Sequence, residues 1–331
     1  MCSRAEGPQK SSCLPAVLFI VGPTASGKTP LAVELAKRLN GEVVSADSML
    51  VYRGMDIGTA KPSSRERRGV PHHGIDLLPP SRKFSVFQYR RYALKVLREI
   101  TGRGHLPIVA GGTGFYVRAL LEGLSSQPGA NAHLRRKLER EALLKGPEAL
   151  YAKLLKADPV RAKAIGPHNL RRIIRALEIY RVSGRKPSEP LKKSPGLGEL
   201  GYRPVVIGLN RDRAALYDAI NRRVDTMFRK GLVREVRRLA KQRLSDTARQ
   251  GVGYKELFPV IAAAGVNAGC RYRASSEVKD RIKQATRHFA KRQWTWFRRE
   301  KGIRWVDWPE GVPVAEMARR IAKDFFGASH G

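Results

Sequence analysis

Residues 16–29 read AVLFIVGPTASGKT, and this stretch decides the fold. Its first six residues form a continuous apolar run, typical of a strand that is buried on both faces of a parallel sheet. The next eight fit the pattern G-x-x-x-x-G-K-[ST], in which a strand leads through a glycine-rich turn into a helix. In that geometry backbone N–H groups and the helix N-terminus point at a phosphate. The stretch therefore predicts an α/β fold with a phosphate site at the end of a strand.

The loop assigns a role to each of its residues. Lys28 adds a positive charge, and the hydroxyl of Thr29 can hold Mg²⁺ beside the phosphate oxygens. The pattern specifies a polyphosphate, and it fits a nucleoside triphosphate and a diphosphate leaving group equally well. The residues expected to bind the phosphates are Gly22, Pro23, Thr24, Ala25, Ser26, Gly27, Lys28 and Thr29.

The rest of the core repeats the strand pattern. Leu31, Leu35 and Leu39 recur every fourth residue after the loop, which predicts an amphipathic helix. Short apolar strands that alternate with such helices indicate a doubly wound parallel sheet, similar to that of P-loop NTPases. The other runs that resemble the first strand, each followed by Asp, Gly or Asn, are residues 42–46, 106–110 and 205–209.

A change of pattern separates a second region. From residue 133 to 181 the apolar periodicity is helical throughout, with Gly-Pro and Asp-Pro pairs as breaks, which predicts a small all-helical insertion domain. We expect the following organisation along the chain: an N-terminal tail at 1–14, the first part of the core at 15–126, the insertion at 127–200, the second part of the core with basic helices at 201–310, and a C-terminal helix and tail at 311–331.

The charge balance is strongly basic. The chain has 331 residues, with 64 Lys and Arg against 29 Asp and Glu, a formal net charge of +35. Nucleic acid is the usual partner of a protein with such a high positive charge. The alternative interpretation is a basic surface that is merely solvated. The placement of the charge favours nucleic acid, because Lys283, Arg287 and Lys291 form a stripe beside an apolar helix face. That face is predicted to contain Val278, Ile282, Phe289 and Trp296.

Several classes of protein are disfavoured by the sequence. The three cysteines are Cys2, Cys13 and Cys270, and they form no CxxC pair. We therefore expect neither a disulfide framework nor a zinc module. This cysteine usage is typical of a protein in the reducing cytoplasm. The longest apolar run, residues 14–21, is interrupted by Pro15 and is far shorter than the about 20 residues of a transmembrane helix. We therefore expect no membrane association.

Some residues have two possible roles. Asp47 follows the second predicted strand and lies at the same end of the sheet as the loop, where it suits either a general base or an ordinary turn. The aromatic residues Tyr52, Phe115 and Tyr116 suit either stacking on a nucleic-acid base or core packing. His72 and His73 resemble half of a metal site, but a loop role is favoured since no matching cluster exists.

Eight segments point to one family. They resemble, in order, motifs of the bacterial-type tRNA dimethylallyltransferase (isopentenyl-tRNA transferase) family, and the similarity extends from about residue 17 to about residue 305. The segments are GPTASGKT at 22–29, SADSMLVYRGMDIGTAKP at 45–62, PHHGIDLL at 71–78, GGTGFYVRALLEGL at 111–124, RRIIRALEIY at 171–180, INRRVDTMF at 220–228, GVGYKE at 251–256 and ATRHFAKRQWTWFR at 285–298.

The resemblance implies an enzyme and its catalytic residues. Members transfer a dimethylallyl group from dimethylallyl diphosphate to N6 of the adenosine next to the tRNA anticodon, with Mg²⁺. It implies that the loop holds the donor diphosphate, that Arg223 contacts the same leaving group, and that Asp47 is the general base. Lys28 and Thr29 complete the catalytic set, with Thr29 as the metal ligand. A cytoplasmic monomer that binds the anticodon stem-loop is expected.

The resemblance also implies contacts with tRNA. Two departures from the family pattern affect them: Leu50 replaces a Gln found in many members, and Gln250 replaces a basic residue found in some. The residues show no counterpart of the long zinc-finger tail of eukaryotic members, so a bacterial-type enzyme is expected. The expected tRNA-contacting residues are Asp47, Ser48, Met49, Leu50, Thr113, Arg135, Arg171, Arg172, Ile173, Ile174, Arg175, Gln250, Gly251, Val252, Gly253, Tyr254 and Lys255.

Two other functions fit the loop. A nucleoside or small-molecule kinase would use Asp47 to deprotonate a hydroxyl. An RNA-binding protein would use the loop as an ATP-driven switch. Both alternatives predict that ATP is bound and consumed, so the fate of ATP distinguishes them from prenyl transfer.

Overall fold

A six-stranded parallel sheet forms the centre of the molecule. The structure is a computed structural model that describes residues 14–263 and 275–327. The strands are arranged in the order β3-β2-β4-β1-β5-β6, and every pairing is parallel. This confirms the predicted α/β class. The strands are β1 (Ala16–Val21), β2 (Gly41–Ser45), β3 (His72–His73), β4 (Leu106–Gly111), β5 (Arg203–Asn210) and β6 (Ile303–Asp307).

The central strand is buried on both faces because its apolar side chains alternate between two layers of helices. Val17, Phe19 and Val21 of β1 pack with α3 (Val86–Gly102) and α4 (Gly114–Leu121). Leu18 and Ile20 pack on the opposite face with α1 (Lys28–Arg38) and α14 (Val314–Phe326). The continuous apolar run at residues 16–21 is the sequence signature of this two-sided burial.

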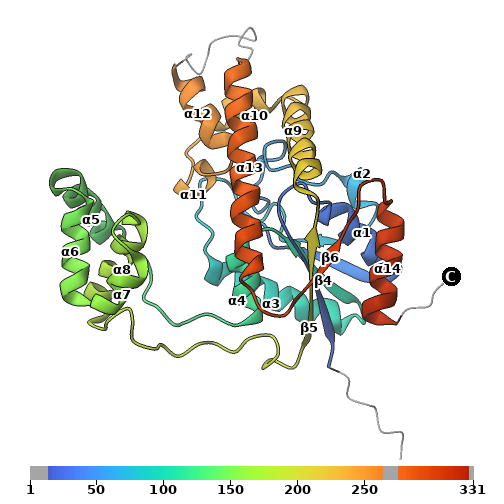
Figure 1. Cartoon of the computed structure of the whole chain (residues 1–331), viewed down its shortest axis with the longest axis horizontal. Helices are drawn as coiled ribbons and strands as arrows, with labels where there is room; N and C mark the ends of the chain where they lie inside the picture. Colours follow the sequence, from blue (N-terminus) through green and yellow to red (C-terminus); the bar gives the residue numbers. More distant parts are fainter. Residues whose placement is uncertain (1–13, 264–274, 328–331) are drawn as a thin grey trace, which may run out of the picture. The chain divides into compact units, whose positions relative to one another are not determined.

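A third hydrophobic cluster lies beside the sheet. Helices α9 (Arg213–Arg229), α10 (Leu232–Ala240), α12 (Tyr254–Ala263) and α13 (Ser276–Arg298) surround the segment that follows β2 (Figure 1). Tyr52 and Met55 of that segment are fully buried. The cluster therefore anchors the chain that leaves the end of β2. The short helix α11 (Asp246–Arg249) adds Ala248 to this cluster, whereas the short helix α2 (Ser64–Arg67) has no buried residue and contacts α1.

Residues Gly123–Pro195 form a separate compact unit, while the sheet belongs to the rest of the chain. Its four helices enclose their own core, which includes Leu138, Leu150, Leu154 and Leu177. Gly146-Pro147 separates α5 from α6, Asp158-Pro159 separates α6 from α7, and Gly166 ends α7, so the breaks seen in the sequence are true helix boundaries. The helices are α5 (Ala132–Lys145), α6 (Pro147–Ala157), α7 (Pro159–Ile165) and α8 (Leu170–Ser183).

Two strands were not predicted from the sequence. β3 has only two residues, too few for any periodic signal. β6 reads IRWVD, and none of its residues is fully buried, as expected of an edge strand. The continuous apolar runs identified the four inner strands but could not identify these edges.

The predicted buried face of α13 needs a correction. Val278 and Ile282 are buried as expected, whereas Phe289 and Trp296 are only partly buried. The buried positions further along the helix are Ala290, Gln293 and Phe297. A seven-residue repeat drifts by about 20° per heptad around a straight α-helix, so Phe289 and Trp296 lie at the margin of the buried face, where Trp296 still packs against the first core cluster.

Some expectations lie outside the described residues. They concern the N-terminal tail up to residue 13 and all three cysteines. Among the helices that are described, none has both the length and the apolar character required to cross a bilayer.

Candidate active site

The loop between β1 and α1 has the geometry of a phosphate cradle. Gly27 has a φ of 94°, and a Cβ at this position would lie 2.7 Å from the ring of Trp308, so only glycine fits. No side chain in the described part of the chain caps the start of α1, which leaves its first N–H groups available to an anion. Within the same part of the chain, the hydroxyl of Ser26 is buried and has no hydrogen-bond partner. These features suit a bound phosphate.

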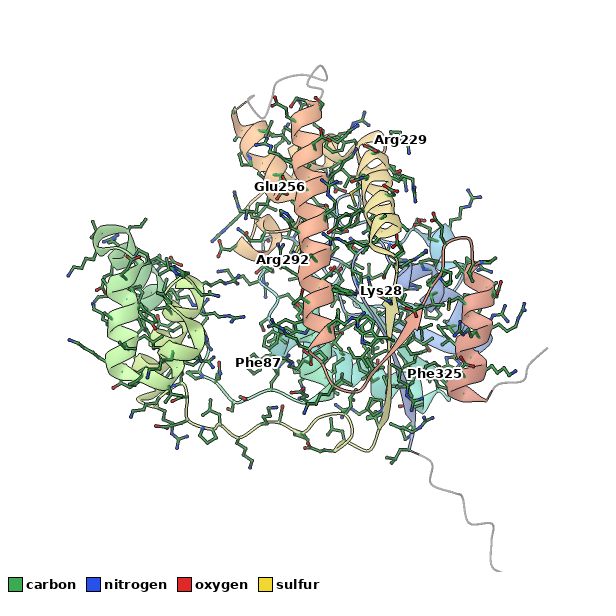
Figure 2. All side chains as sticks on the ribbon, viewed as in Figure 1. Lys28, Phe87, Arg229, Glu256, Arg292 and Phe325 are labelled. Atoms are coloured by element: carbon green, nitrogen blue, oxygen red, sulfur yellow. The ribbon has the colours of Figure 1, made fainter. Side chains whose placement is uncertain are left out.

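Lys28, Arg223 and Asp47 come together at this loop. The Nζ atom of Lys28 donates a hydrogen bond to the Pro23 carbonyl at 2.6 Å. Burial and the nearby Arg223 lower the pKa of Lys28 to about 7, and the Asp47 carboxylate opposes that shift. Burial also lowers the pKa of Arg223, and Asp47 again opposes it. Asp47 acts on both cations, and Glu66 acts more weakly on Arg223, so two buried cations remain that an incoming polyanion would stabilise. Lys28 lies at the start of α1 (Figure 2).

Asp47 lies in a turn that is fixed to the neighbouring strand. Its Oδ1 atom accepts the N–H of Met49 at 2.8 Å, which is the contact of an ordinary Asx turn. The N–H of Ser48 donates to Oγ1 of Thr113 at 3.1 Å, and the N–H of Thr113 donates to the Ala46 carbonyl at 3.1 Å. The turn role occupies only one carboxylate oxygen, so it is compatible with a role as a base. Thr113 helps to orient this turn.

Gln293 was not predicted as a site residue, although it binds the loop directly. Its Oε1 atom accepts the N–H of Thr24 at 2.7 Å, and its Nε2 atom donates to the Gly112 carbonyl at 2.9 Å. The side chain is almost completely buried. One residue of α13 thus joins the phosphate loop to the end of β4. The only signal in the sequence was a polar residue within the apolar periodicity of a helix, which is easily read as surface.

The three candidate aromatic residues differ in their surroundings. Tyr52 and Tyr116 are buried, and the ring of Tyr116 stacks on Tyr89 with centroids 3.9 Å apart. Burial raises the pKa of Tyr116. Phe115 is 49% exposed. The structure therefore favours core packing for the two tyrosines and leaves Phe115 as a candidate for stacking on a base.

The segments expected to contact tRNA in the core unit lie close together. Ser48, Met49 and Leu50 are partly buried beside Asp47, and a Cβ on Gly251 would lie 3.0 Å from the sulfur of Met49. Two segments distant in sequence are therefore adjacent. Gln250 and Lys255 are exposed, Val252 is partly buried, and Gly251, Gly253 and Tyr254 are buried.

In the insertion, a buried carboxylate organises two of the expected arginines. Glu178 forms ion pairs with Arg135 at 2.9 Å and with Arg175 at 2.7 Å. Arg171 and Arg172 are exposed, so they can reach a phosphate. Ile173 and Ile174 are buried in the hydrophobic core of this unit, where their side chains support the helix.

The basic stripe of α13 is partly engaged with α9. Lys283 forms an ion pair with Asp225 at 2.9 Å, and Arg287 donates to Asn221 at 2.9 Å. Lys291 is exposed. Its neighbour Arg292 is exposed as well (Figure 2). The exposed cations of the stripe are therefore concentrated in its C-terminal half.

A divalent cation fits the loop only together with a phosphate ligand. The described residues contain no group of three His, Cys, Asp or Glu side chains that could hold a metal. Mg²⁺ is commonly held by one or two protein oxygens and by substrate phosphates, and the hydroxyl of Thr29 in the first turn of α1 offers one such oxygen. His73 instead hydrogen-bonds Glu42 at 2.6 Å, and His72 hydrogen-bonds the Val70 carbonyl.

Comparisons with known proteins agree on one family. The family model described as IPP transferase matches residues 50–300, and the model described as isopentenyl transferase matches residues 15–73. The tRNA dimethylallyltransferase of Bacillus subtilis strain 168 is 44% identical over 307 residues, covering 92% of this chain and 95% of that protein. The corresponding protein of Acetivibrio thermocellus is 44% identical over 294 residues, covering 88% and 91%.

Solved structures show the same relationship. The tRNA isopentenylpyrophosphate transferase of Bacillus halodurans is 42% identical, with a TM-score of 0.67 over 95% of this chain and 96% of that chain. A eukaryotic dimethylallyltransferase acting on tRNA is 27% identical, with a TM-score of 0.75 over 94% of this chain and 78% of that one.

Proposed function

The chain belongs to the IPP transferase family, and on that premise we propose that it transfers a dimethylallyl group from dimethylallyl diphosphate to N6 of the adenosine next to the tRNA anticodon. Membership makes the chain an enzyme that prenylates tRNA; the donor and the acceptor atom are the proposal. The observation that supports it best is the meeting of Lys28, Arg223 and Asp47 at an uncapped helix N-terminus.

The phosphate side of this site suits the departure of a diphosphate. As the allylic C–O bond breaks, negative charge accumulates on the diphosphate, and the loop N–H groups, Lys28 and Arg223 stabilise it. A magnesium ion held by Thr29 and the diphosphate oxygens would add to that stabilisation. The same groups would bind a triphosphate equally well, so the nature of the acceptor decides the reaction.

The carboxylate side suits attack by an amine. Adenine N6 is a poor nucleophile because its lone pair is delocalised into the ring, and it becomes acidic as the N–C bond forms. Asp47 accepts that proton while the diphosphate leaves, which balances the reaction. Transfer to a positioned base contributes typically 10²- to 10⁴-fold. The adenine has to leave the stacked anticodon loop in order to reach the site.

The basic surfaces suit the acceptor. Lys291 and Arg292 on α13, and Arg171 and Arg172 in the insertion, are exposed cations able to contact RNA phosphates. On the core unit we expect the anticodon stem-loop to contact Lys291, Arg292 and the segments at 47–50 and 250–255, and we expect the insertion to contact tRNA through its own arginines. The proposal includes Mg²⁺ as cofactor, an insertion that contacts tRNA, and a monomer acting in the cytoplasm.

The test is to incubate the protein with labelled dimethylallyl diphosphate and unmodified tRNA, with ATP and small acceptors as controls. We expect label in the RNA and no consumption of ATP. Transfer of phosphate from ATP to a small molecule, with no label in RNA, would instead support the kinase alternative, which the family comparison does not favour.

A further inference from the structure

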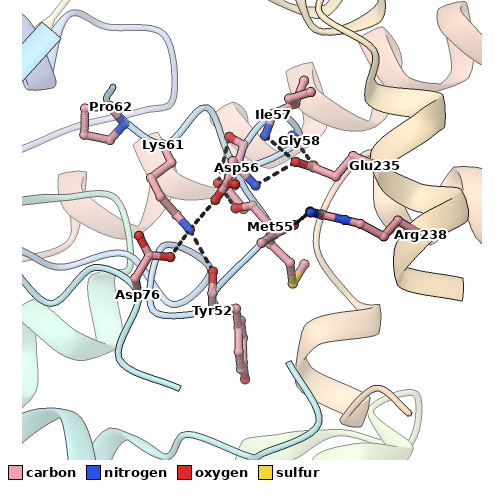
Figure 3. Close-up of polar contacts among 12 residues, drawn as sticks. Tyr52, Met55, Asp56, Ile57, Gly58, Lys61, Pro62, Asp76, Glu235 and Arg238 are labelled. Carbon is pink, nitrogen blue, oxygen red and sulfur yellow. Dashed lines mark hydrogen bonds and ion pairs between the residues drawn. The ribbon is translucent and has the colours of Figure 1, made fainter. Parts of the chain in front are cut away.

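A buried carboxylate outside the phosphate site holds the loop that follows Asp47. Glu235 of α10 is 6% exposed. Its Oε2 atom accepts the N–H groups of Asp56 at 2.9 Å and Ile57 at 2.8 Å. Its Oε1 atom accepts the N–H of Gly58 at 3.0 Å and the hydroxyl of Tyr254 at 2.6 Å. Figure 3 shows these contacts with the loop.

These contacts hold the loop rigidly. Four donors on one carboxylate are charge-assisted hydrogen bonds, which are stronger than neutral ones. A Cβ on Gly58 would lie 2.5 Å from the ring of Tyr254, so the loop is pressed directly against that ring. Arg238, also on helix α10, donates a hydrogen bond to the Gly54 carbonyl at 2.6 Å. Lys61, which follows the loop, donates hydrogen bonds to the Asp56 carboxylate and to the Tyr52 carbonyl.

The loop in turn contacts a proposed catalytic group. The carbonyl of Thr59, the residue after Gly58, accepts a hydrogen bond from Nη2 of Arg223 at 3.2 Å. A guanidinium is planar, so a contact on one of its nitrogens restricts the direction of the others. The path from Glu235 to Arg223 therefore runs through two consecutive residues of one backbone segment.

We propose that Glu235, together with Tyr254, is a positioning residue that fixes the 56–59 loop so that the Thr59 carbonyl orients Arg223 toward the departing diphosphate. This inference rests on the proposed function. It assigns a catalytic consequence to a side chain that does not itself contact the phosphate loop. It also connects the 250–255 segment, through Tyr254, with the residue that stabilises the leaving group.

The test is a double-mutant cycle measured under single-turnover conditions. We expect Glu235→Gln to slow prenyl transfer roughly 10- to 100-fold, the size expected for a displaced catalytic group, with tRNA affinity unchanged. Tyr254→Phe, which removes only the hydroxyl, should slow transfer in the same direction by less. In an Arg223→Ala background neither substitution should slow transfer further, because the group they position is already absent.

The control is Glu42→Gln. Glu42 is also a buried carboxylate with several polar partners, among them Arg103 and His105, but it lies near the start of β2, away from the phosphate loop. The Glu42→Gln variant should have a lower melting temperature and an unchanged rate of prenyl transfer. If Glu235→Gln does not fold, Tyr254→Phe completes the cycle.

The outcomes are distinguishable. If the rate losses of Glu235→Gln and Tyr254→Phe multiply with that of Arg223→Ala, or if neither slows transfer, the positioning role is wrong. If the unaltered enzyme transfers no prenyl group to tRNA, the proposed function fails instead.

Discussion

The ionisation of Lys28 is shifted strongly by its burial at the phosphate loop. Its pKa of about 7 results from burial and from Arg223, so before the donor binds this lysine is mostly neutral above pH 7. A bound diphosphate favours the charged form and raises the pKa again. Binding of the donor should therefore take up protons, and this uptake should become larger as the pH rises above 7.

We predict an uptake that approaches one proton per donor bound at pH 8. Calorimetry in two buffers of different ionisation enthalpy measures this number. Because the protonated lysine binds better, the contribution of Lys28 to donor affinity should fall as the pH rises through 7. Lys28→Ala is the control for titration of the donor itself. Equal proton uptake by this variant and the unaltered protein would show that Lys28 is already charged in the empty site.

The proposed role of Asp47 as the general base predicts the effect of replacing it by Asn. Asp47→Asn keeps an oxygen that can accept the N–H of Met49, so the turn should survive. We expect transfer to slow by about 10²- to 10⁴-fold because the base is lost, while tRNA binding stays within a few-fold. Rapid-quench transfer assays and filter binding measure the two quantities. Full activity of the variant would remove Asp47 from the role of base.

At the scale of the element, α13 joins the phosphate loop to the end of β4 through Gln293. Replacing it by Met keeps the volume but leaves the Thr24 N–H and the Gly112 carbonyl without this partner. We predict a loss of about 1–3 kcal/mol in the free energy of unfolding and weaker donor binding. Urea denaturation measures the first quantity. Thr295→Ala, at an exposed position of the same helix, should change neither; similar stability of both variants would contradict the role of Gln293.

Elements of this protein differ in how well their sequence predicts them. The buried strand β1 and the glycine loop could be predicted from the sequence. Burial on two faces requires a continuous apolar run, and phosphate binding requires the glycine-rich pattern. The edge strand β6 could not be predicted, because an exposed edge places no strong demand on its side chains. Gln293, Glu235 and Glu178 were missed for a common reason. A buried polar residue is defined by partners distant in sequence, such as Thr24 or Gly58, and periodicity alone reads it as surface.

At the scale of the whole molecule, the net charge of +35 is the dominant feature. If exposed cations contact tRNA phosphates, affinity should fall steeply with added salt. We predict that Lys291→Ala reduces the magnitude of the slope of log affinity against log salt by about 0.7 to 0.9, the value for one phosphate contact. Fluorescence anisotropy at several salt concentrations measures it. A flat salt response of the unaltered protein would rule out phosphate contacts as the basis of tRNA binding.

The group that leaves the phosphate loop distinguishes prenyl transfer from phosphoryl transfer. Diphosphate released and prenyl groups gained by tRNA can be measured in the same reaction, with ATP present. We expect one diphosphate per prenylated adenosine and no loss of ATP. Orthophosphate or ADP formation with unmodified tRNA would contradict prenyl transfer.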